Sequence, residues 1–556
     1  MKKSRYHYLI LFIFLLSCQG KNKSVTAEEI NSLSLKKGEV VLCGPPDKQF
    51  GTVNFEFSCS EKVTQDFNLG MAMLHSFEYD EAEKIFAKIV DKQPGCAIAY
   101  WGIAMSNYHP LWTPPTPAEL EKGAKAISIA KSIEQKSERE SAYIDAMAMF
   151  YNDRDKLDNS TRTINFKNGM ERLYKKYPAD KEAAIFYALS LDAAANPSDK
   201  TFTNQKQAGE ILNAIYAAEP NHPGIVHYII HSYDYPGLAE LALPAARKYA
   251  SIAPSSAHAQ HMPSHIFTRL GLWNECIQSN LVSTGSAKCY AENAGIKGHW
   301  DEELHGMDYL MYAYLQKGDN KRAKEQLDYL KTITEVSPVN FKVAYAFAAI
   351  PSRYFVENRM WKEAADLVIT QTSFPWQKFR WQEGMIHFTK LLGNVHIGRL
   401  DSARTQLNNL KLIHEGLIKE KDAYKANQVD IQAKAGEAWI LFQQGNKEEA
   451  LIMMRTAADM EDATEKHPVT PCEIIPAREL LGDMLILSAR YAEALDVYKQ
   501  DLSTHPNRFN GLYGAGVAAE KSGKFSDAKL YYQDLLTTSE SGSPRAELGH
   551  AKSFLK

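Results

Sequence analysis

The sequence has no excess of charge of either sign and no long basic run. Its 556 residues include 64 Lys and Arg against 67 Asp and Glu, which gives a formal net charge of −3. Nucleic-acid binding depends on a basic surface that neutralises phosphates, so we expect no nucleic-acid partner. Beyond the N-terminal segment, no run of 18 uncharged apolar residues occurs, so we expect no membrane-spanning helix there.

Common catalytic and cofactor motifs are also missing. The chain contains no Cys-x-x-Cys, Gly-x-Ser-x-Gly, P-loop, dinucleotide fingerprint or His-Glu-x-x-His sequence. These motifs mark thioredoxin-type redox proteins, α/β-hydrolases, nucleotide-binding enzymes and one class of zinc protease. The sequence therefore favours a protein that is not an enzyme, and leaves catalysis by another arrangement open.

The N-terminus has the pattern of an export signal. Lys2, Lys3 and Arg5 precede an apolar run over residues 8–16, which predicts a signal peptide over residues 1–17. Leu-Leu-Ser-Cys at residues 15–18 resembles the bacterial lipobox, and the resemblance implies lipidation of Cys18. Since Gln19 rather than Asp follows, it also implies an outer-membrane lipoprotein of the cell envelope that faces the periplasm or the cell surface. An ordinary cleaved signal with a coincidental cysteine is the alternative.

The remaining chain divides into three parts. We expect a lipid-anchored tether and irregular segment over residues 18–61, a helical-repeat body over 62–538 and a C-terminal tail over 539–556. Outside the cytoplasm disulfides can form, and proximity in sequence makes Cys43/Cys59 and Cys276/Cys289 candidate pairs.

A repeat of helix pairs is visible near both ends of the body. Small and aromatic residues recur at the spacing of the 34-residue tetratricopeptide pattern, in which small residues let two antiparallel helices pack closely. The matching residues are Gly70, Ala82, Phe86 and Pro94, then Gly482, Ala494, Tyr498 and Pro506, then Gly516, Ala528 and Tyr532. Weaker copies lie between them. The sequence therefore predicts an all-α, TPR-like right-handed superhelical solenoid of antiparallel helix pairs with one continuous core.

Several segments resemble a group of bacterial tetratricopeptide proteins with no established activity. The segments are residues 72–82, 99–105, 261–267 (His-Met-Pro-Ser-His-Ile-Phe), 307–310 and 467–479. The resemblance extends over about residues 50–538 and supports the fold. Tetratricopeptide proteins generally bind peptides or proteins in a concave groove, so the resemblance implies a membrane-anchored scaffold with a protein or peptide partner.

Histidines are concentrated in one part of the chain. Six of the 17 lie between residues 222 and 265, and four of these form the His-x-x-x-His pairs His227/His231 and His261/His265. Residues four apart share one face of a helix, although Pro263 could interrupt the second helix. In the tetratricopeptide frame, both pairs lie on the groove wall with four further residues. These are His305, Asp308, Tyr312 and Arg353.

Three interpretations of this polar strip remain open. It could be a structural ladder of hydrogen bonds, or a site for an organic or peptide ligand. It could also bind zinc or another divalent transition metal, since imidazole is a preferred ligand of these ions. The metal interpretation, which includes a metal-dependent enzyme, assigns His227, His231, His261 and His265 as ligands, with Asp308 as a carboxylate ligand or an outer partner.

Overall fold

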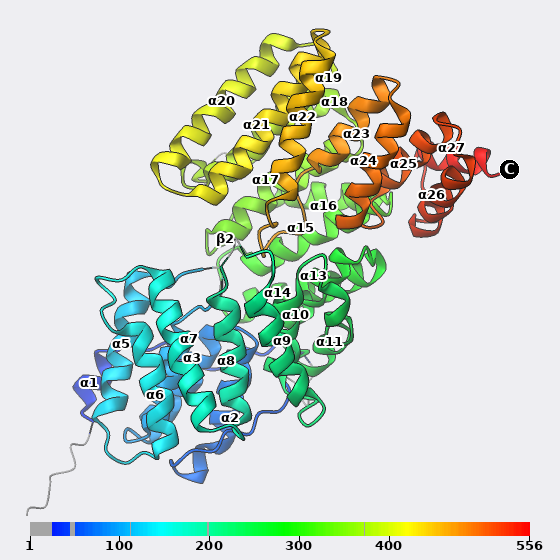
Figure 1. Ribbon diagram of the computed structural model, residues 1–556. Coiled ribbons are helices and arrows are strands. Elements are labelled where there is room, and N and C mark those ends of the chain that lie inside the picture. The colour runs from blue at the N-terminus through cyan, green and yellow to red at the C-terminus, as the bar shows by residue number, and fades with distance from the viewer. Residues whose placement is uncertain (1–24, 45–49, 112, 197–198, 372) are drawn as a thin grey trace, which may run out of the picture.

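The computed structural model describes residues 25–44, 50–111, 113–196, 199–371 and 373–556 (Figure 1). Helices joined by short turns make up most of these residues. The predicted signal and Cys18 lie outside the described residues. Among the described helices, none is both long and apolar enough to cross a membrane.

The first half of the chain consists of helices. They are α1 (Ala27–Asn31), η1 (Glu61–Val63), α2 (Thr64–His75), α3 (Tyr79–Lys92), α4 (Ala97–Ser106), α5 (Pro117–Ser132), α6 (Glu138–Tyr151), α7 (Asn159–Lys176), α8 (Lys181–Ala193), α9 (Thr203–Tyr216), α10 (Pro223–Tyr233), α11 (Ala239–Ile252), α12 (Ala257–His261), α13 (Pro263–Arg269) and α14 (Trp273–Asn293).

The second half adds two short parallel strands that pair with each other. Its elements are β1 (His299–Trp300), α15 (Asp301–Gln316), α16 (Asn320–Thr332), β2 (Val336–Ser337), α17 (Phe341–Glu357), α18 (Trp361–Ala365), η2 (Trp376–Lys378), α19 (Arg380–His396), α20 (Leu400–Lys419), α21 (Ala423–Gln443), α22 (Lys447–Asp462), α23 (Ala477–Leu487), α24 (Tyr491–Thr504), α25 (Phe509–Lys521), α26 (Phe525–Thr538) and α27 (Ala546–Phe554).

The predicted TPR-like fold is confirmed by how the helices of each pair pack. A Cβ atom added to Gly70 of α2 would lie 2.9 Å from the ring of Phe86 in α3, and one added to Gly482 would lie 2.6 Å from the ring of Tyr498. The third copy has the same close approach at Gly516. Each ring thus fills the space that a larger residue would occupy, which brings the two helices together.

The inner wall of the array is covered by other parts of the chain. Helix α2 contacts α10, and α15 contacts α25, although each pair is far apart in sequence. The loop between α22 and α23 lies against α17, where the Tyr345 hydroxyl donates a 2.9 Å hydrogen bond to the Cys472 carbonyl (Figure 1). Residues on this wall therefore face the protein's own segments.

Two hydrophobic clusters form, where the sequence predicted one continuous core. The first extends from Ile30 to Tyr354 and also includes Phe374 and Cys472, and the second extends from Tyr345 to Ala551. Figure 1 shows the corresponding lobes, with α2–α11 in one and α19–α27 in the other. Helix α17 divides its residues between them, since Phe347 lies in the first cluster and Ala348 in the second. The residues after 538 include α27, which packs on α26.

The disulfides join residues that are distant in sequence. Cys43 pairs with Cys289 across 246 residues, and Cys59 pairs with Cys96. Neither predicted pair forms, because the N-terminal segment runs across the body to α14 and α4. Its Phe55 is buried in the first cluster. The free, buried cysteines among the described residues are Cys276 and Cys472.

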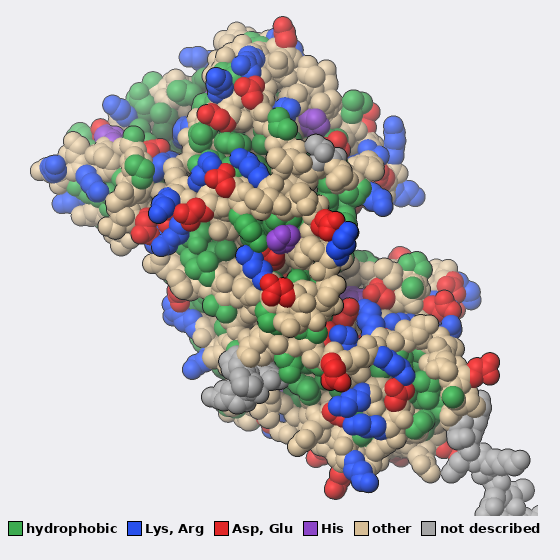
Figure 2. All heavy atoms as spheres, turned by 180° about the vertical axis from the view of Figure 1, so that it is seen from behind, with side chains coloured by type: hydrophobic (Ala, Val, Ile, Leu, Met, Phe, Trp, Pro, Cys, Tyr) green, Lys and Arg blue, Asp and Glu red, His purple; other side chains and the backbone are tan. Residues whose placement is uncertain are grey.

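Positive and negative side chains are interspersed over the face of the molecule in Figure 2. Some form exposed ion pairs, such as Arg380 with Glu420 at 2.7 Å. Exposed pairs of this kind typically contribute only about 0–1 kcal/mol. The stability of the fold therefore depends on its buried contacts.

Candidate metal centre

Six histidines from four helices gather in two groups of three on the inner wall. The first triad is His227 and His231 of α10 with His258 of α12, and the second triad is His261 of α12, His265 of α13 and His305 of α15. In each triad, one nitrogen from every ring lies within 4.8 Å of the others. This is a separation at which three imidazoles could share one metal ion.

In the first triad, His227 lies between the other two rings. Its Nε2 atom is 3.0 Å from Nε2 of His231 and 3.1 Å from Nε2 of His258. The side chain of His227 is fully buried, and Phe77 packs against its ring with the centroids 4.4 Å apart.

In the second triad, Nε2 of His261 lies 3.0 Å from Nε2 of His265. The ring of His305 packs beside His261, with 4.1 Å between the centroids. The Tyr309 hydroxyl lies 3.3 Å from Nε2 of His265. All three histidines are buried.

Pro263 divides the helix that carries the second pair without separating the two rings. Met262, between α12 and α13, keeps right-handed helical dihedral angles of −52° and −37°. Its N–H still bonds to the carbonyl of His258 at 2.9 Å. The chain therefore continues in a helical path, and His261 and His265 stay on one face.

The other nitrogen of three rings is held by a hydrogen-bond acceptor. Nδ1 of His227 lies 2.6 Å from the backbone carbonyl of His75, and Nδ1 of His265 lies 3.0 Å from a carboxylate oxygen of Asp234. Nδ1 of His261 lies 2.6 Å from the amide oxygen of Asn280, whose NH₂ group donates to the Cys276 carbonyl. That second bond determines which end of the amide faces the histidine.

Asp234 is kept ionised by two cations. Arg269 donates to its Oδ1 at 2.9 Å, and Lys466 lies 3.3 Å from its Oδ2. Although burial raises the pKa of Asp234, these charges and His265 hold the pKa well below its usual range. Lys466 belongs to the loop between α22 and α23, so the second lobe helps to orient a histidine of the first.

Burial lowers the pKa of every imidazole in the two triads. For His227 the pKa falls to about 3, and neighbouring positive groups add to the shift at His231 and His305. Asp234 opposes the shift at His265 without reversing it. At neutral pH the rings are therefore uncharged, which is the form that binds metals.

These contacts determine the protons of the second triad. Carbonyl and carboxylate oxygens only accept, so His261 and His265 each carry their single proton on Nδ1. Their Nε2 atoms then both present lone pairs, 3.0 Å apart. Two lone pairs at this distance repel each other, and a cation bound to both removes the repulsion. Outer partners that fix the proton on the far nitrogen are typical of metal-bound histidines.

A third group of possible ligands is already connected by hydrogen bonds between a carboxylate and two imidazoles. The carboxylate of Glu182 lies between His75 and His222, with each of its oxygens 2.8–2.9 Å from one Nε2 atom. Nδ1 of His75 lies 3.0 Å from the Tyr228 hydroxyl, which can donate to it. Glu182 and His75 are thus paired without a cation, whereas the buried Nδ1 atom of His222 has no hydrogen-bond partner.

A fourth group is likewise connected by hydrogen bonds. The Cys472 thiol donates to Glu473 at 2.9 Å. His505 lies between two carboxylates, 2.9 Å from Asp501 and 3.4 Å from Glu473, and these contacts raise its pKa although burial lowers it. A protonated imidazole satisfies both acceptors.

Asp308, Tyr312 and Arg353 lie apart from the two triads. Asp308 forms an ion pair with Arg353, whose guanidinium also donates to the Cys472 carbonyl. The Tyr312 hydroxyl accepts a 3.1 Å hydrogen bond from Arg508. The structure thus corrects the predicted role of Asp308, because Arg353 occupies its carboxylate, and an imidazole takes the third place in each triad. All three residues are buried, and none faces an open groove.

Sequence reasoning missed residues that complete the site. His258 is part of the histidine-rich segment, three residues before His261, but it falls outside the four-residue spacing. Asn280, Asp234 and Lys466 hold the rings from other helices and from a loop more than 200 residues away. Asn280 and Asp234 reach the rings through the packing of helices in the first lobe, and Lys466 reaches Asp234 through the contact between the lobes.

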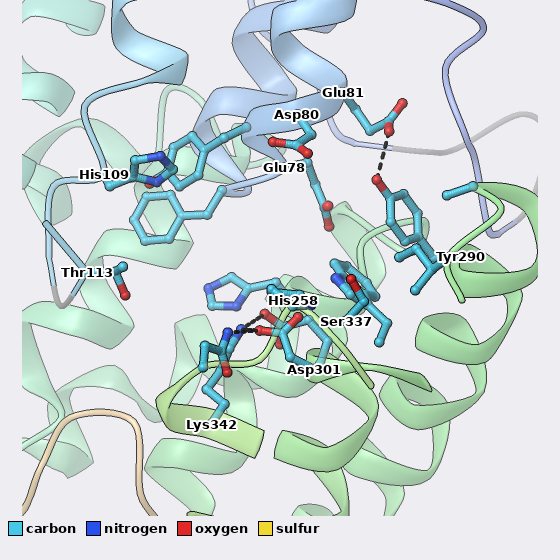
Figure 3. A pocket seen from close by; sticks show the side chains of 18 of the residues that line it. Glu78, Asp80, Glu81, His109, Thr113, His258, Tyr290, Asp301, Ser337 and Lys342 are labelled. Atoms are coloured by element: carbon cyan, nitrogen blue, oxygen red, sulfur yellow. Dashed lines mark hydrogen bonds and ion pairs between the residues drawn. The ribbon is translucent and has the colours of Figure 1, made fainter. Parts of the chain in front are cut away.

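A cavity of about 570 Å³ reaches the first triad at His258. Figure 3 shows Glu78 and His258 directed into it from opposite sides. Burial raises the pKa of Glu78 to about 8, although Ser256 donates to it at 2.6 Å. His261, His265 and His305 do not line this cavity.

No family model and no curated protein matches the chain. Among solved structures, the crystal structure of the P58(IPK) TPR domain matches 68% of this chain and 98% of that chain, with 13% sequence identity and a TM-score of 0.20. A TM-score this low carries no argument about function. The fold follows from the helix packing described above.

The buried pair of Asp308 and Arg353 provides a test of the inner wall. Arg353→Met leaves the buried Asp308 carboxylate without its cation and removes one of the two hydrogen bonds to the Cys472 carbonyl, so we expect a loss of about 3–5 kcal/mol in the free energy of unfolding. Urea denaturation measures it. Arg380→Met, at an exposed ion pair, should cost less than about 1 kcal/mol. Equal effects of the two variants would contradict the buried arrangement.

Proposed function

We propose that this protein binds transition-metal ions, one in each histidine triad. The observation that carries the proposal is the pair of Nε2 lone pairs of His261 and His265, 3.0 Å apart, with both Nδ1 atoms held by acceptors. Around Glu182 and Glu473, by contrast, each histidine faces a carboxylate to which it can donate a proton. In the second triad, the acceptors on Nδ1 leave both Nε2 atoms without a ring proton, and the Tyr309 hydroxyl can donate to Nε2 of His265 alone.

The distances suit an ion that prefers imidazole. Two nitrogens bound at about 2.0–2.1 Å lie about 2.9 Å apart at a right angle and about 3.3 Å apart in a tetrahedron. The Nε2 separations of 3.0 and 3.1 Å lie in this range. Neutral imidazole ligands favour zinc, copper, nickel or iron over magnesium or calcium. Three protein ligands also leave a coordination position for another group.

The two triads differ in their access to other molecules. His258 of the first triad lines the 570 Å³ cavity, whereas no histidine of the second triad does. A metal in the first triad could therefore accept a ligand from the cavity, which is what a metal-dependent enzyme needs. A metal in the second triad would serve to hold α12, α13 and α15 together.

Metal analysis tests the proposal directly. Protein purified without a histidine tag and loaded with zinc should hold about two ions per chain, as the two triads require, and removal of the metal should lower Tm because binding stabilises the native state. His261→Ala and His227→Ala should each remove one ion. Inductively coupled plasma mass spectrometry gives the metal content.

The control is His414→Ala, which changes a histidine outside both triads and should keep both ions. Circular dichroism of each variant shows that it is folded. Unchanged metal content in folded His261→Ala protein would overturn the second site, and unchanged content in folded His227→Ala protein would overturn the first.

We also propose that the protein is a lipoprotein of the bacterial cell envelope, anchored at Cys18. The lipobox-like sequence motivates this, and the two disulfides support it, because disulfides persist in oxidising compartments. One acyl chain binds membranes only weakly, so stable attachment requires the multiple chains of a lipidated N-terminal cysteine.

Cys18→Ser should abolish the incorporation of radioactive palmitate in the native host and move the protein from the membrane fraction to the soluble fraction. Ser24→Ala changes a residue of the tether and should leave both properties intact. Retention of the label in the Cys18→Ser protein would exclude this anchor.

A protein or peptide partner is our second candidate function, since helical repeats present large continuous surfaces. Asp308, Tyr312 and Arg353 are engaged internally, so the contact would form elsewhere. Helix α20 exposes Leu412 by 64% and Ile418 by 54%. A photo-crosslinking residue at position 412 should capture one specific protein in the cell envelope, and the same residue at position 88 should not. Absence of a specific product at 412 would exclude α20 as the surface.

A further inference from the structure

The cavity beside the first triad has an aromatic wall. Tyr290 and Trp300 pack against each other with ring centroids 4.3 Å apart, and Phe77 stacks on Tyr79 at 5.4 Å. All four residues line the cavity, Phe77 and Tyr79 from the turn before α3 and its first residue, and Tyr290 and Trp300 from α14 and β1. Its volume of about 570 Å³ is in the range of small-molecule sites, which is about 300–1,000 Å³.

Carboxylates outnumber cations in the same lining. The acidic residues are Glu78, Asp80, Glu81, Asp301 and Glu302, and the basic residues are Lys84 and Lys342. Both lysines are already paired, Lys84 with Glu81 at 2.7 Å, and Lys342 with Asp301 at 2.7 Å and with Glu302. Without Glu78, whose pKa of about 8 leaves it mostly protonated at neutral pH, the lining still has four carboxyl groups against two lysines, and these lysines are not available to an anionic ligand.

One carboxylate oxygen in the cavity has no hydrogen-bond partner. Lys342 bonds to Oε1 of Glu302, whereas Oε2 is buried and accepts no hydrogen bond. Glu302 is only 9% exposed, so solvent reaches it poorly. A buried acceptor without a donor costs about 1–3 kcal/mol, more when it is charged. A ligand that donates to this oxygen would recover that energy.

We propose that this cavity binds a small organic cation, an amine or a guanidine, whose charged group donates to Oε2 of Glu302 while its carbon chain lies along the aromatic wall. Charge and donor chemistry both favour this class. Ammonium and guanidinium groups supply N–H donors and no acceptors, and aromatic faces attract cations. A carboxylate or phosphate ligand would meet like charges. The proposal concerns the cavity alone and goes beyond the metal function.

Isothermal titration calorimetry tests it with three four-carbon probes, n-butylamine, n-butanol and butyrate, and with the larger guanidine agmatine. The metal-free full chain should bind n-butylamine and agmatine, and neither n-butanol nor butyrate. Glu302→Gln should weaken amine binding at least tenfold. Glu335→Gln removes the same charge from a half-exposed residue that pairs with Lys297 outside the lining, and should change the affinity less than twofold.

Lys342→Met gives a result in the opposite direction. It removes the cation that competes for Glu302, so amine binding should become stronger. A general loss of structure would weaken binding instead, which keeps the test decisive if Glu302→Gln does not fold. Equal binding of butanol and butylamine, preference for butyrate, or no binding by either amine would overturn the proposal.

The metal sites and the cavity are separable in this design. His227→Ala should lose the ion of the first triad and keep amine binding, whereas Glu302→Gln should keep both ions. A protein that binds amines and no metal would disprove the proposed function and support the cavity ligand. A protein that binds metal and no amine would support the proposed metal function and disprove the cavity ligand.

Discussion

The exclusion of water from the inner wall is the constraint on which the site depends. Once helices and loops cover this wall, every polar group on it requires a partner from the chain itself. Arg353 and Asp308 meet this requirement as an ion pair, and Arg508 meets it between Glu357 and Glu479. The second histidine triad meets it differently, because its Nδ1 contacts leave two lone pairs facing each other.

The covering segments explain why an array of helix pairs has a buried site where tetratricopeptide proteins generally have an open groove. The turn after α2 places Phe77 on the ring of His227, and the loop before α23 brings Lys466 to Asp234. Both segments lie far in sequence from the residues that they cover. The histidines and Phe77 therefore belong to the first lobe, and the second lobe adds Lys466, which holds the Asp234 partner of His265.

The sequence predicted what depends on local spacing. Gly482 and Tyr498 meet because both belong to one helix pair, and His261 and His265 meet because four residues make about one turn. Proximity in sequence did not predict the contacts between segments that are far apart along the chain. Cys43 pairs with Cys289 rather than with its neighbour in sequence, because the N-terminal segment crosses the body. The partners of the histidine triads were unpredictable for the same reason.

Helix α12 links the two triads in a way that the sequence spacing alone does not suggest. His258 and His261 lie three residues apart on this one short helix, yet each completes a different triad. Residues at this spacing have Cβ atoms about 5–6 Å apart, so any displacement of α12 moves a ligand of both triads. The first triad borders the cavity, and a metal bound to the second would join α12 to α13 and α15, so occupation of the second would restrain the ring that faces the cavity. A metal in the enclosed second triad would thus keep His258 of the first triad in position at the cavity.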